Sequence, residues 1–310
     1  MAEMSEPVGP DELDRLFARF VVGRTPERFA LAVSGGSDSI ALMVLLAEWL
    51  GVVGRPAQAF TVLTVDHRLR PQSAAEAATV ARQAAALGYA HATLVWDGDK
   101  PQTGLQAAAR TARYRLMAAY ARAHGIGLIF TGHTADDQAE TLLMRLARGS
   151  GLDGLSAMAP VADLHEDVAP DGARLCIARP LLEVPKARLQ ASLRQRGIGW
   201  IEDPSNASPA FERTRLRAAR AELDALGLTG AMLGLSARRL QQVRAALERW
   251  VADVLDPAAG TVEIHACGFF AIDLPRLRAL PQEIAARVLA RTVAAAGGSA
   301  GPVPLAGLEA

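Results

Sequence analysis

Short apolar runs alternate with longer helix-like stretches along most of the chain. The runs have the length of strands and lie at 29–33, 59–65, 91–96, 127–133 and 175–178. The stretches between them are predicted to be helices at 40–50, 73–87, 105–124, 136–148 and 185–196. Strands that alternate with helices are typical of α/β proteins. The pattern therefore predicts a doubly wound parallel sheet.

The pattern changes after these strands. Residues 200–206 are predicted to form a loop, and 211–254 are almost entirely helix-forming. Two short segments, 261–265 and 269–274, fit a hairpin, and 281–295 fits a last helix. The sequence therefore predicts a second, mainly helical domain.

These two patterns set the expected domain boundary. We predict a first domain at 1–212 and a second at 213–310. Within the first domain, 161–174 is polar and is predicted to be an exposed hairpin or loop. The chain stops at 307–310 in what resembles the middle of an apolar-periodic helix, so we expect the second domain to be truncated at its C-terminus.

Composition narrows the class of protein. Half of the 310 residues are hydrophobic. The formal net charge is zero, so the overall charge gives no indication of a nucleic-acid partner. The two cysteines, Cys176 and Cys267, are far apart in sequence and form no Cys-x-x-Cys motif, which disfavours a zinc ribbon or a cysteine-held iron–sulfur cluster. No secretory signal and no run of about 18 apolar residues is present. We expect a soluble cytoplasmic protein with no membrane partner.

The first strand ends in a polar, glycine-containing turn that precedes a predicted helix. This turn is Ser34-Gly35-Gly36-Ser37-Asp38-Ser39. Glycine lets an anion approach backbone N–H groups, and the start of a helix attracts phosphate. Asp38 suits such a site if a divalent cation joins it to phosphate oxygens. A helix-capping turn without further function is the alternative. No Gly-Lys-Ser/Thr follows, so this is not a Walker loop.

Polar residues also follow two other predicted strands. Asp66 and His67 end the second, and Gly132 and His133 end the fourth. The residues after His133 include three acids, Asp136, Asp137 and Glu140. Polar residues at the carboxyl ends of parallel strands face the ligand crevice of an open α/β sheet. Acids in a first helical turn also complement the helix dipole, which is the structural alternative.

Arginines form two further groups of candidate residues. Arg110 and Arg113 lie three positions apart on one face of the helix predicted at 105–124, and a solvated basic face is the alternative. The second group begins the helical domain and comprises Arg213, Arg215 and Arg217, which suit contacts to nucleic-acid phosphates.

Taken together, the motifs resemble those of the tRNA(Ile)-lysidine synthases, a family within the PP-loop ATP pyrophosphatases. The resemblance covers about residues 29–217. The motifs occur in the family's order: Ser34–Ser39, Val65-Asp66-His67, Ala109-Arg110-x-x-Arg113-Tyr114, Gly132-His133-x-x-Asp136-Asp137-Gln138-Ala139-Glu140-Thr141, Arg148-Gly149-Ser150-Gly151, Arg179-Pro180-Leu181-Leu182 and Asp203-Pro204-Ser205-Asn206. Many members have His where Thr134 stands here, so we assign Thr134 no chemistry.

The resemblance implies a fold like that of the adenine-nucleotide alpha hydrolases, together with a reaction. ATP, Mg²⁺ and L-lysine would convert the wobble cytidine of the CAU-anticodon tRNA(Ile) to lysidine through an adenylated cytidine, releasing AMP and pyrophosphate. The implied ATP-binding residues are Ser34, Gly35, Gly36, Ser37, Asp38, Ser39, Asp66, His67, Gly132 and His133, with Asp38 on Mg²⁺. Asp38, Asp137, Arg110 and Arg113 would be catalytic, with the two arginines on the α-phosphate or the lysine carboxylate. Asp136, Asp137 and Glu140 would bind lysine, and Arg213, Arg215 and Arg217 the tRNA.

Other functions stay open at this point. One alternative is another PP-loop tRNA modifier, such as a cytidine 2-thiolase, although such enzymes rely on cysteine pairs that Cys176 and Cys267 do not supply. Another is a catalytically silent RNA-binding relative, against which the intact loop and the acid pair argue. A glutaminase-dependent amidotransferase would need a domain before Phe29, where we expect no room for one. The sequence leaves the oligomeric state open, with a homodimer as one option.

Overall fold

The computed structural model describes residues 5–23, 28–168, 174–202, 212–265 and 267–297. Contacts between residues divide the chain into two units. The first consists of 1–149 and 157–237, and the second of 150–156 and 238–310. Each unit is described separately below.

The first unit is built on a six-stranded sheet with the strand order β3-β2-β1-β4-β6-β5. The strands are β1 (Phe29–Ala32), β2 (Phe60–Asp66), β3 (Ala90–Val95), β4 (Leu128–Thr131), β5 (Val161–Val168) and β6 (Arg174–Ala178). Neighbouring strands from β3 to β6 run parallel, whereas β5 pairs antiparallel to β6 at the edge. The predicted doubly wound α/β fold is thus confirmed, with one antiparallel strand where the sequence indicated a hairpin or loop.

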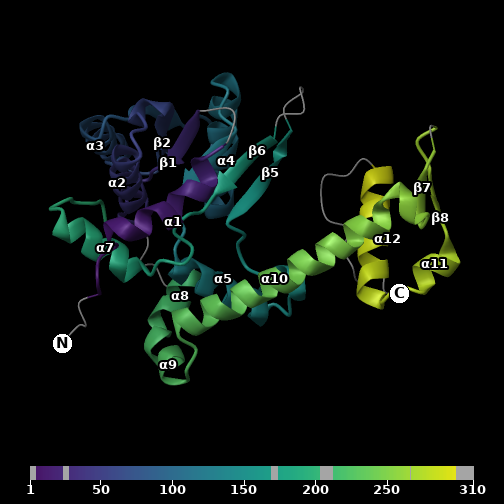
Figure 1. Cartoon of the computed structure of the whole chain (residues 1–310). Coiled ribbons are helices and arrows are strands. Elements are labelled where there is room, and N and C mark those ends of the chain that lie inside the picture. Colours follow the sequence, from purple (N-terminus) through teal and green to yellow (C-terminus); the bar gives the residue numbers. More distant parts are fainter. Residues whose placement is uncertain (1–4, 24–27, 169–173, 203–211, 266, 298–310) are drawn as a thin grey trace. The chain divides into compact units, whose positions relative to one another are not determined.

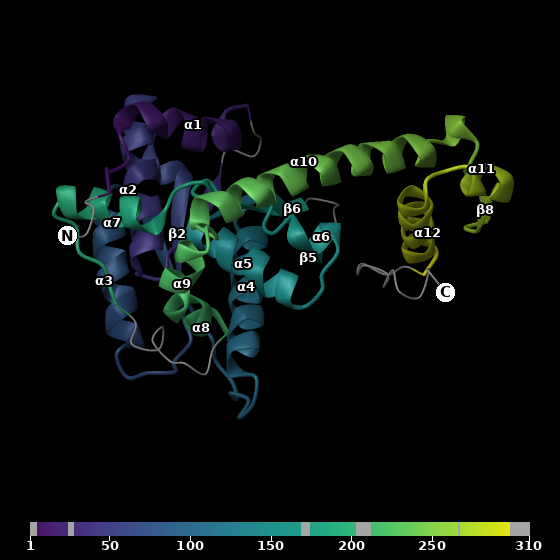
Figure 2. The same cartoon turned by 90° about the horizontal axis from the view of Figure 1, so that it is seen from below.

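Helices cover both faces of this sheet (Figure 1). The helices that lie wholly in this unit are α1 (Pro10–Val21), α2 (Ser37–Val52), α3 (Ser73–Ala86), α4 (Leu105–Ala123), α5 (Ala135–Ala147), α7 (Lys186–Gln195), α8 (Glu212–Ala218) and α9 (Arg220–Ala225), with a 3₁₀ turn, η1 (Ala57–Ala59). Of these, α8 contacts α5 and α9. On one face, α2 packs against both α1 and α7 (Figure 2).

The hydrophobic core follows from the alternation of side chains along β1. Phe29 and Leu31 point toward α1, α2 and α7, where Phe29 stacks on Phe60 with 4.8 Å between ring centroids. Ala30 points to the opposite face and packs with Met117 of α4. Because β1 is buried on both faces, it reads as a continuous apolar run. This central strand carries the polar turn that follows it to the carboxyl edge of the sheet.

The second unit is mainly helical and has its own small core. Its elements are α6 (Leu152–Leu155), most of α10 (Gly230–Leu255), η3 (Pro257–Ala259), β7 (Val262–Ile264), β8 (Phe270–Ile272), α11 (Leu274–Arg278) and α12 (Gln282–Ala296). The strands β7 and β8 form the predicted antiparallel hairpin. Val251, Val262, Leu277 and Val288 form the centre of the core.

A buried arginine ties the second unit together. The guanidinium of Arg287 contacts Asp153 at 3.0 Å, Glu248 at 2.8 Å and Glu283 at 2.8 Å. Asp153 belongs to α6, which follows α5 in the chain, so a segment from the middle of the sequence supplies a partner to the C-terminal helices. Burial acts to lower the pKa of Arg287, but the bonds to Asp153 and Glu283 outweigh it and raise that pKa.

The observed unit boundary differs from the predicted one. Helices α8, α9 and the first part of α10, up to Ala237, group with the sheet rather than with the C-terminal helices. An ion pair between Arg217 of α8 and the buried Glu140 of α5 is one physical reason. Among the helices of the described residues, none combines the length and the apolar character that a bilayer crossing requires.

Candidate active site

The turn between β1 and α2 has a defined backbone that leaves its amides at the sheet edge. Ser39 Oγ receives a hydrogen bond from the Ser34 backbone N–H at 3.2 Å and donates one to the Gly36 carbonyl at 2.9 Å. Gly35 has a φ of +92°, a conformation that favours glycine. Its carbonyl accepts a hydrogen bond from Ile201 N at 2.9 Å, and a Cβ at Gly35 would lie 2.6 Å from Ile201 Cδ1. The turn therefore requires glycine at this position.

Gly132 explains how the segment after β4 comes so near this turn. A Cβ on Gly132 would lie 2.8 Å from the backbone oxygen of Asp38. Absence of a side chain lets the two backbones approach, which puts residues 133–137 beside the first turn of α2. His133 lies at the same edge and shares a 2.9 Å hydrogen bond with Thr131 Oγ1.

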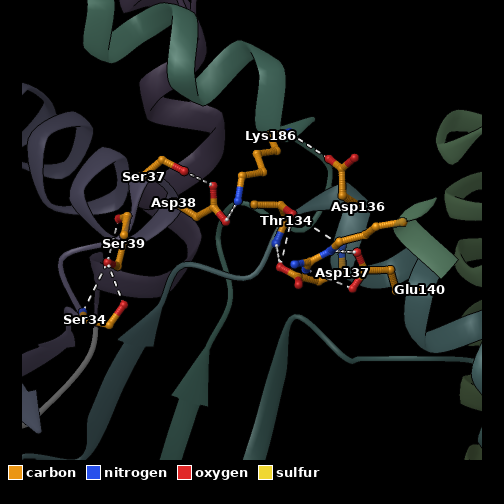
Figure 3. Close-up of polar contacts among 11 residues, drawn as sticks. Ser34, Ser37, Asp38, Ser39, Thr134, Asp136, Asp137, Glu140 and Lys186 are labelled. Carbon is orange, nitrogen blue, oxygen red and sulfur yellow. Dashed lines mark hydrogen bonds and ion pairs between the residues drawn. The ribbon is translucent and has the colours of Figure 1, made fainter. Parts of the chain in front are cut away.

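Asp38 is held between a hydroxyl and an ammonium group (Figure 3). Ser37 Oγ donates to Asp38 Oδ1 at 2.9 Å, and Lys186 Nζ lies 3.2 Å from Asp38 Oδ2. Burial raises the pKa of Asp38, and the charge of Lys186 opposes that rise. Sequence reasoning assigned no role to Lys186. The available signal was its rarity, because the chain has only Lys100 and Lys186, and its place at a helix start that follows a strand end.

Each acid of α5 has a partner within the chain (Figure 3). Asp136 Oδ2 accepts a 2.7 Å hydrogen bond from the Lys186 backbone N–H. Asp137 Oδ2 accepts hydrogen bonds from the backbone N–H and the hydroxyl of Thr134, at 2.8 and 3.1 Å, which completes a capping box. Glu140 is buried and accepts two hydrogen bonds from Arg217.

These groups surround a cavity of about 260 Å³. Asp38, Lys186 and the three acids of α5 line it together with Arg217 and Arg220, and leucines of α5, α8, α9 and α10 complete its wall. The Oδ1 atoms of Asp136 and Asp137 have no hydrogen-bond donor among the described residues. The cavity thus offers free carboxylate oxygens, an ammonium group and guanidinium groups at one edge of the turn.

The structure separates the arginines that the sequence grouped as tRNA contacts. Arg215 is exposed on α8. Arg217 lines the cavity and forms a 2.6 Å ion pair with Glu140. The side chain of Arg213 lies outside what the structure describes.

The residues that follow β2 border a second cavity, of about 460 Å³. Asp66 Oδ1 accepts a 2.8 Å hydrogen bond from the backbone N–H of Arg68, which has a φ of +51°. His67 lies edge-on to Trp96, with 5.7 Å between ring centroids, and both its ring nitrogens are buried without a partner among the described residues. Burial, with the charges of Arg113 and Lys100, lowers the pKa of His67 to about 4. The imidazole is therefore neutral near pH 7.

Metal binding would depend on Asp38. Among the residues that the structure describes, no group of three or more His, Cys, Asp or Glu side chains could hold a metal ion by itself. A carboxylate beside a phosphate-sized turn is nevertheless the donor type that Mg²⁺ takes when phosphates and water supply its other ligands. The residues present therefore fit a magnesium ion that arrives with a nucleotide.

Comparisons with known proteins show what the whole chain is similar to. A family model described as a PP-loop domain matches residues 10–222. A tRNA(Ile)-lysidine synthase of Rhodopseudomonas palustris is 45% identical, covering 98% of this chain and 84% of the relative. One of Bradyrhizobium diazoefficiens is 43% identical, covering 98% and 82%.

A likeness in three dimensions shows the fold alone. The structure of the U34-tRNA thiolase NcsA from Methanococcus maripaludis, with its [4Fe-4S] cluster, is 15% identical, with a TM-score of 0.59 over 75% of this chain and 78% of that one. In the present chain, Cys176 and Cys267 belong to different units, and neither forms a disulfide. The thiolase alternative is therefore not favoured.

Proposed function

The chain belongs to the tRNA(Ile)-lysidine synthase family, and on that premise we propose how its candidate active site divides the work of one reaction. The enzyme is a ligase that uses ATP to join L-lysine to C2 of the wobble cytidine in the CAU-anticodon tRNA(Ile). AMP and pyrophosphate are the products. The observation that carries the assignment of residues is the position of the turn 34–39 beside a cavity lined by both acids and bases.

We assign ATP to the turn and to the neighbouring strand ends. The backbone amides of 34–39 and the start of α2 suit the pyrophosphate, with Asp66, His67, Gly132 and His133 around the rest of the nucleotide. Mg²⁺ held by Asp38 would neutralise charge on the leaving pyrophosphate. In the first step the cytosine C2 oxygen bonds to the α-phosphorus and the bond to pyrophosphate breaks. Arg110 and Arg113 suit the charge on the α-phosphate or the lysine carboxylate.

We assign lysine to the cavity of about 260 Å³. The free oxygens of Asp136 and Asp137 suit the ammonium groups of lysine. The Glu140–Arg217 pair supplies a guanidinium group that suits its carboxylate. In the second step the lysine amine bonds to C2 and AMP leaves. Lys186 holds Asp38 and, through its backbone, Asp136, so it links the ATP turn to the lysine cavity.

Exposed arginines outside this cavity, Arg215 among them, are assigned to the tRNA backbone. An unstacked cytidine is the expected state of the substrate, because a paired base hides the atom that reacts. A cytoplasmic location follows from these substrates.

The decisive experiment is incubation of the chain with ATP, radiolabelled lysine and purified tRNAs. We expect label in the CAU-anticodon tRNA(Ile) and one AMP per lysine incorporated. The methionine tRNA with the same anticodon is the matched control and should stay unlabelled. Label in neither tRNA, or AMP release without label, would contradict the proposed assignment.

A further inference from the structure

Three arginines gather near Tyr114 on the α4 side of the sheet. Arg110 of α4 lies over the Tyr114 ring, 5.0 Å from its centroid. Tyr114 packs against the core cluster that contains Ile129 of β4 and Leu175 of β6. Arg179 follows β6 directly, and the preceding carbonyl, of Ala178, accepts a hydrogen bond from Thr131 at the end of β4. The third arginine, Arg113, is on α4 one turn after Arg110.

The charge of Arg110 acts on both of the other guanidinium groups. Burial lowers the pKa values of Arg113 and Arg179, and the charge of Arg110 lowers both further. None of the three forms an ion pair with an acid among the described residues. Clustered cations without acids raise the free energy of the folded chain.

Arg179 is the most constrained of the three. It is only 8% exposed, and it is held by a 2.8 Å hydrogen bond from its guanidinium to the Ala159 carbonyl. Its backbone N–H donates to the Pro160 carbonyl, also at 2.8 Å. Its Nε is buried with no acceptor among the described residues. A buried donor without an acceptor is rare in native proteins and indicates a ligand or an ordered water.

We propose that Arg179 completes a phosphate-binding site with Arg110 and Arg113 at the carboxyl edge of β4 and β6. A phosphate offers several oxygens and a full negative charge, which matches forked guanidinium donors better than a single carbonyl does. This inference rests on the proposed function, which supplies two sources of such a group. One is the phosphate that AMP retains from ATP, and the other is a backbone phosphate of the tRNA.

The test compares the full chain with its Arg179→Gln variant in two binding measurements. In the first, AMP and adenosine are titrated separately, because their affinity ratio isolates the phosphate. In the second, an anticodon stem–loop RNA is titrated at several salt concentrations. A nucleotide phosphate predicts an AMP-to-adenosine ratio that falls about tenfold or more in the variant. A tRNA phosphate predicts a similar fall in RNA affinity with a shallower salt dependence, by roughly 0.7 per lost contact.

Either result supports the site and identifies its source. Unchanged ratios and unchanged RNA binding would overturn it and leave Arg179 as a structural residue. Arg122→Gln, in the last turn of α4, is the matched control and should alter neither measurement. If Arg179→Gln does not fold, Arg179→Lys keeps the charge but loses the fork, and wild-type affinity for both ligands would then refute the proposal. Neither titration needs lysine, so a failure of lysine transfer is distinguishable from a failure of this site.

Discussion

Two arginines of this chain are buried to nearly the same degree but differ in whether acids surround them. Arg287, in the second unit, is 6% exposed and is surrounded by three acids. Arg179, at the edge of the sheet in the first unit, is 8% exposed and has only a carbonyl as a side-chain partner among the described residues. The pKa of Arg287 is raised and that of Arg179 is lowered.

The contrast teaches which region serves stability and which serves binding. A buried arginine whose charge is balanced by acids of the same chain holds elements together without a ligand. A buried group left unsatisfied lowers the stability of the free protein and is retained where a ligand uses it. The sheet edge shows the second behaviour at His67 as well as at Arg179. Substitutions should therefore affect activity at the edge and stability in the second unit.

The largest effect is expected for Asp38→Ala. The variant loses the carboxylate assigned to Mg²⁺ and to Lys186, so AMP formation should fall by about two to three orders of magnitude. The melting temperature should change little, because Lys186 is 42% exposed and water can solvate its ammonium group. Single-turnover AMP release and thermal unfolding test both statements. Near wild-type AMP release would remove Asp38 from the mechanism.

Next in size is the difference between Arg287→Gln and Arg179→Gln in stability. Loss of Arg287 removes the shared cation of Asp153, Glu248 and Glu283. These acids are between 31% and 48% exposed, and Arg244 and Arg291 still pair with two of them, so the cost in the unfolding of the second unit should be about 1–3 kcal/mol. Loss of Arg179 leaves no acid without its partner, so the free energy of unfolding should change by about 1 kcal/mol or less. Urea denaturation measures both.

A matched control lies on α10. Arg249 is exposed, and Arg249→Gln should stay within about 0.5 kcal/mol of the wild type. Equal destabilisation by Arg287→Gln and Arg179→Gln would break the comparison on which this prediction depends.

A smaller effect should separate two arginines of one helix. Arg217→Ala removes the partner of buried Glu140, so the KM for lysine should rise at least about tenfold while tRNA affinity stays near wild type. Arg215→Ala should instead weaken tRNA binding a few-fold, reduce its salt slope by roughly 0.7–0.9, and leave the KM for lysine unchanged. Steady-state kinetics and filter binding supply the readouts. A tRNA defect in Arg217→Ala alone would reverse the assignment.

The smallest effect concerns pH. The pKa of His67 is about 4 in the folded protein, below the ordinary value of 6.5, so the unfolded chain binds more protons between these two values. Stability that depends on neutral His67 is therefore fully present above about pH 6.5 and is lost as pH falls toward 4. Burial lowers the pKa of His91 in the same direction, so the wild type alone does not isolate His67.

The variant His67→Gln isolates this contribution. Its free energy of unfolding should decline less steeply between pH 6.5 and 4.5 than that of the wild type, as measured by urea titration at each pH. Parallel curves for the two proteins would show that His67 titrates normally.

The sequence predicted the centre of the sheet because the strands there, β1 and β4, are buried. A strand covered on both faces, such as β1, must be apolar throughout, and its pattern is visible without neighbours. The edge strand β5 is polar and was predicted only as a hairpin or loop. Its pairing depends on β6, which no local pattern in 161–168 encodes. The boundary near 212 was similarly inferred from helical composition, whereas the grouping of α8 and α9 with the sheet depends on tertiary contacts.

In the candidate site, too, local patterns predicted some residues, and others depend on tertiary contacts. Motifs placed Ser34–Ser39 and the acids of α5 at one edge, because strand ends in a parallel sheet share that edge. Spacing did not reveal that Lys186 reaches Asp38, since 148 positions separate them in sequence. It also grouped Arg215 with Arg217, although the direction of a helical side chain depends on what the helix packs against. Arg179 lay in a motif, but no role could be assigned to it before its burial was known.

The placement of residues 150–156 with the second unit has a consequence for how the protein can be taken apart. A ribosome delivers Asp153 to the folding chain well before it delivers Arg287, so this piece of the later unit is made while the sheet is still incomplete. A fragment that begins at residue 238 would contain most of α10 and all of α12, with Glu248 and Glu283, but would lack Asp153, the third acid that Arg287 contacts. Cutting the gene at that position separates Asp153 from the rest of the ionic cluster. A fragment of the second unit that folds by itself would have to include the peptide 150–156.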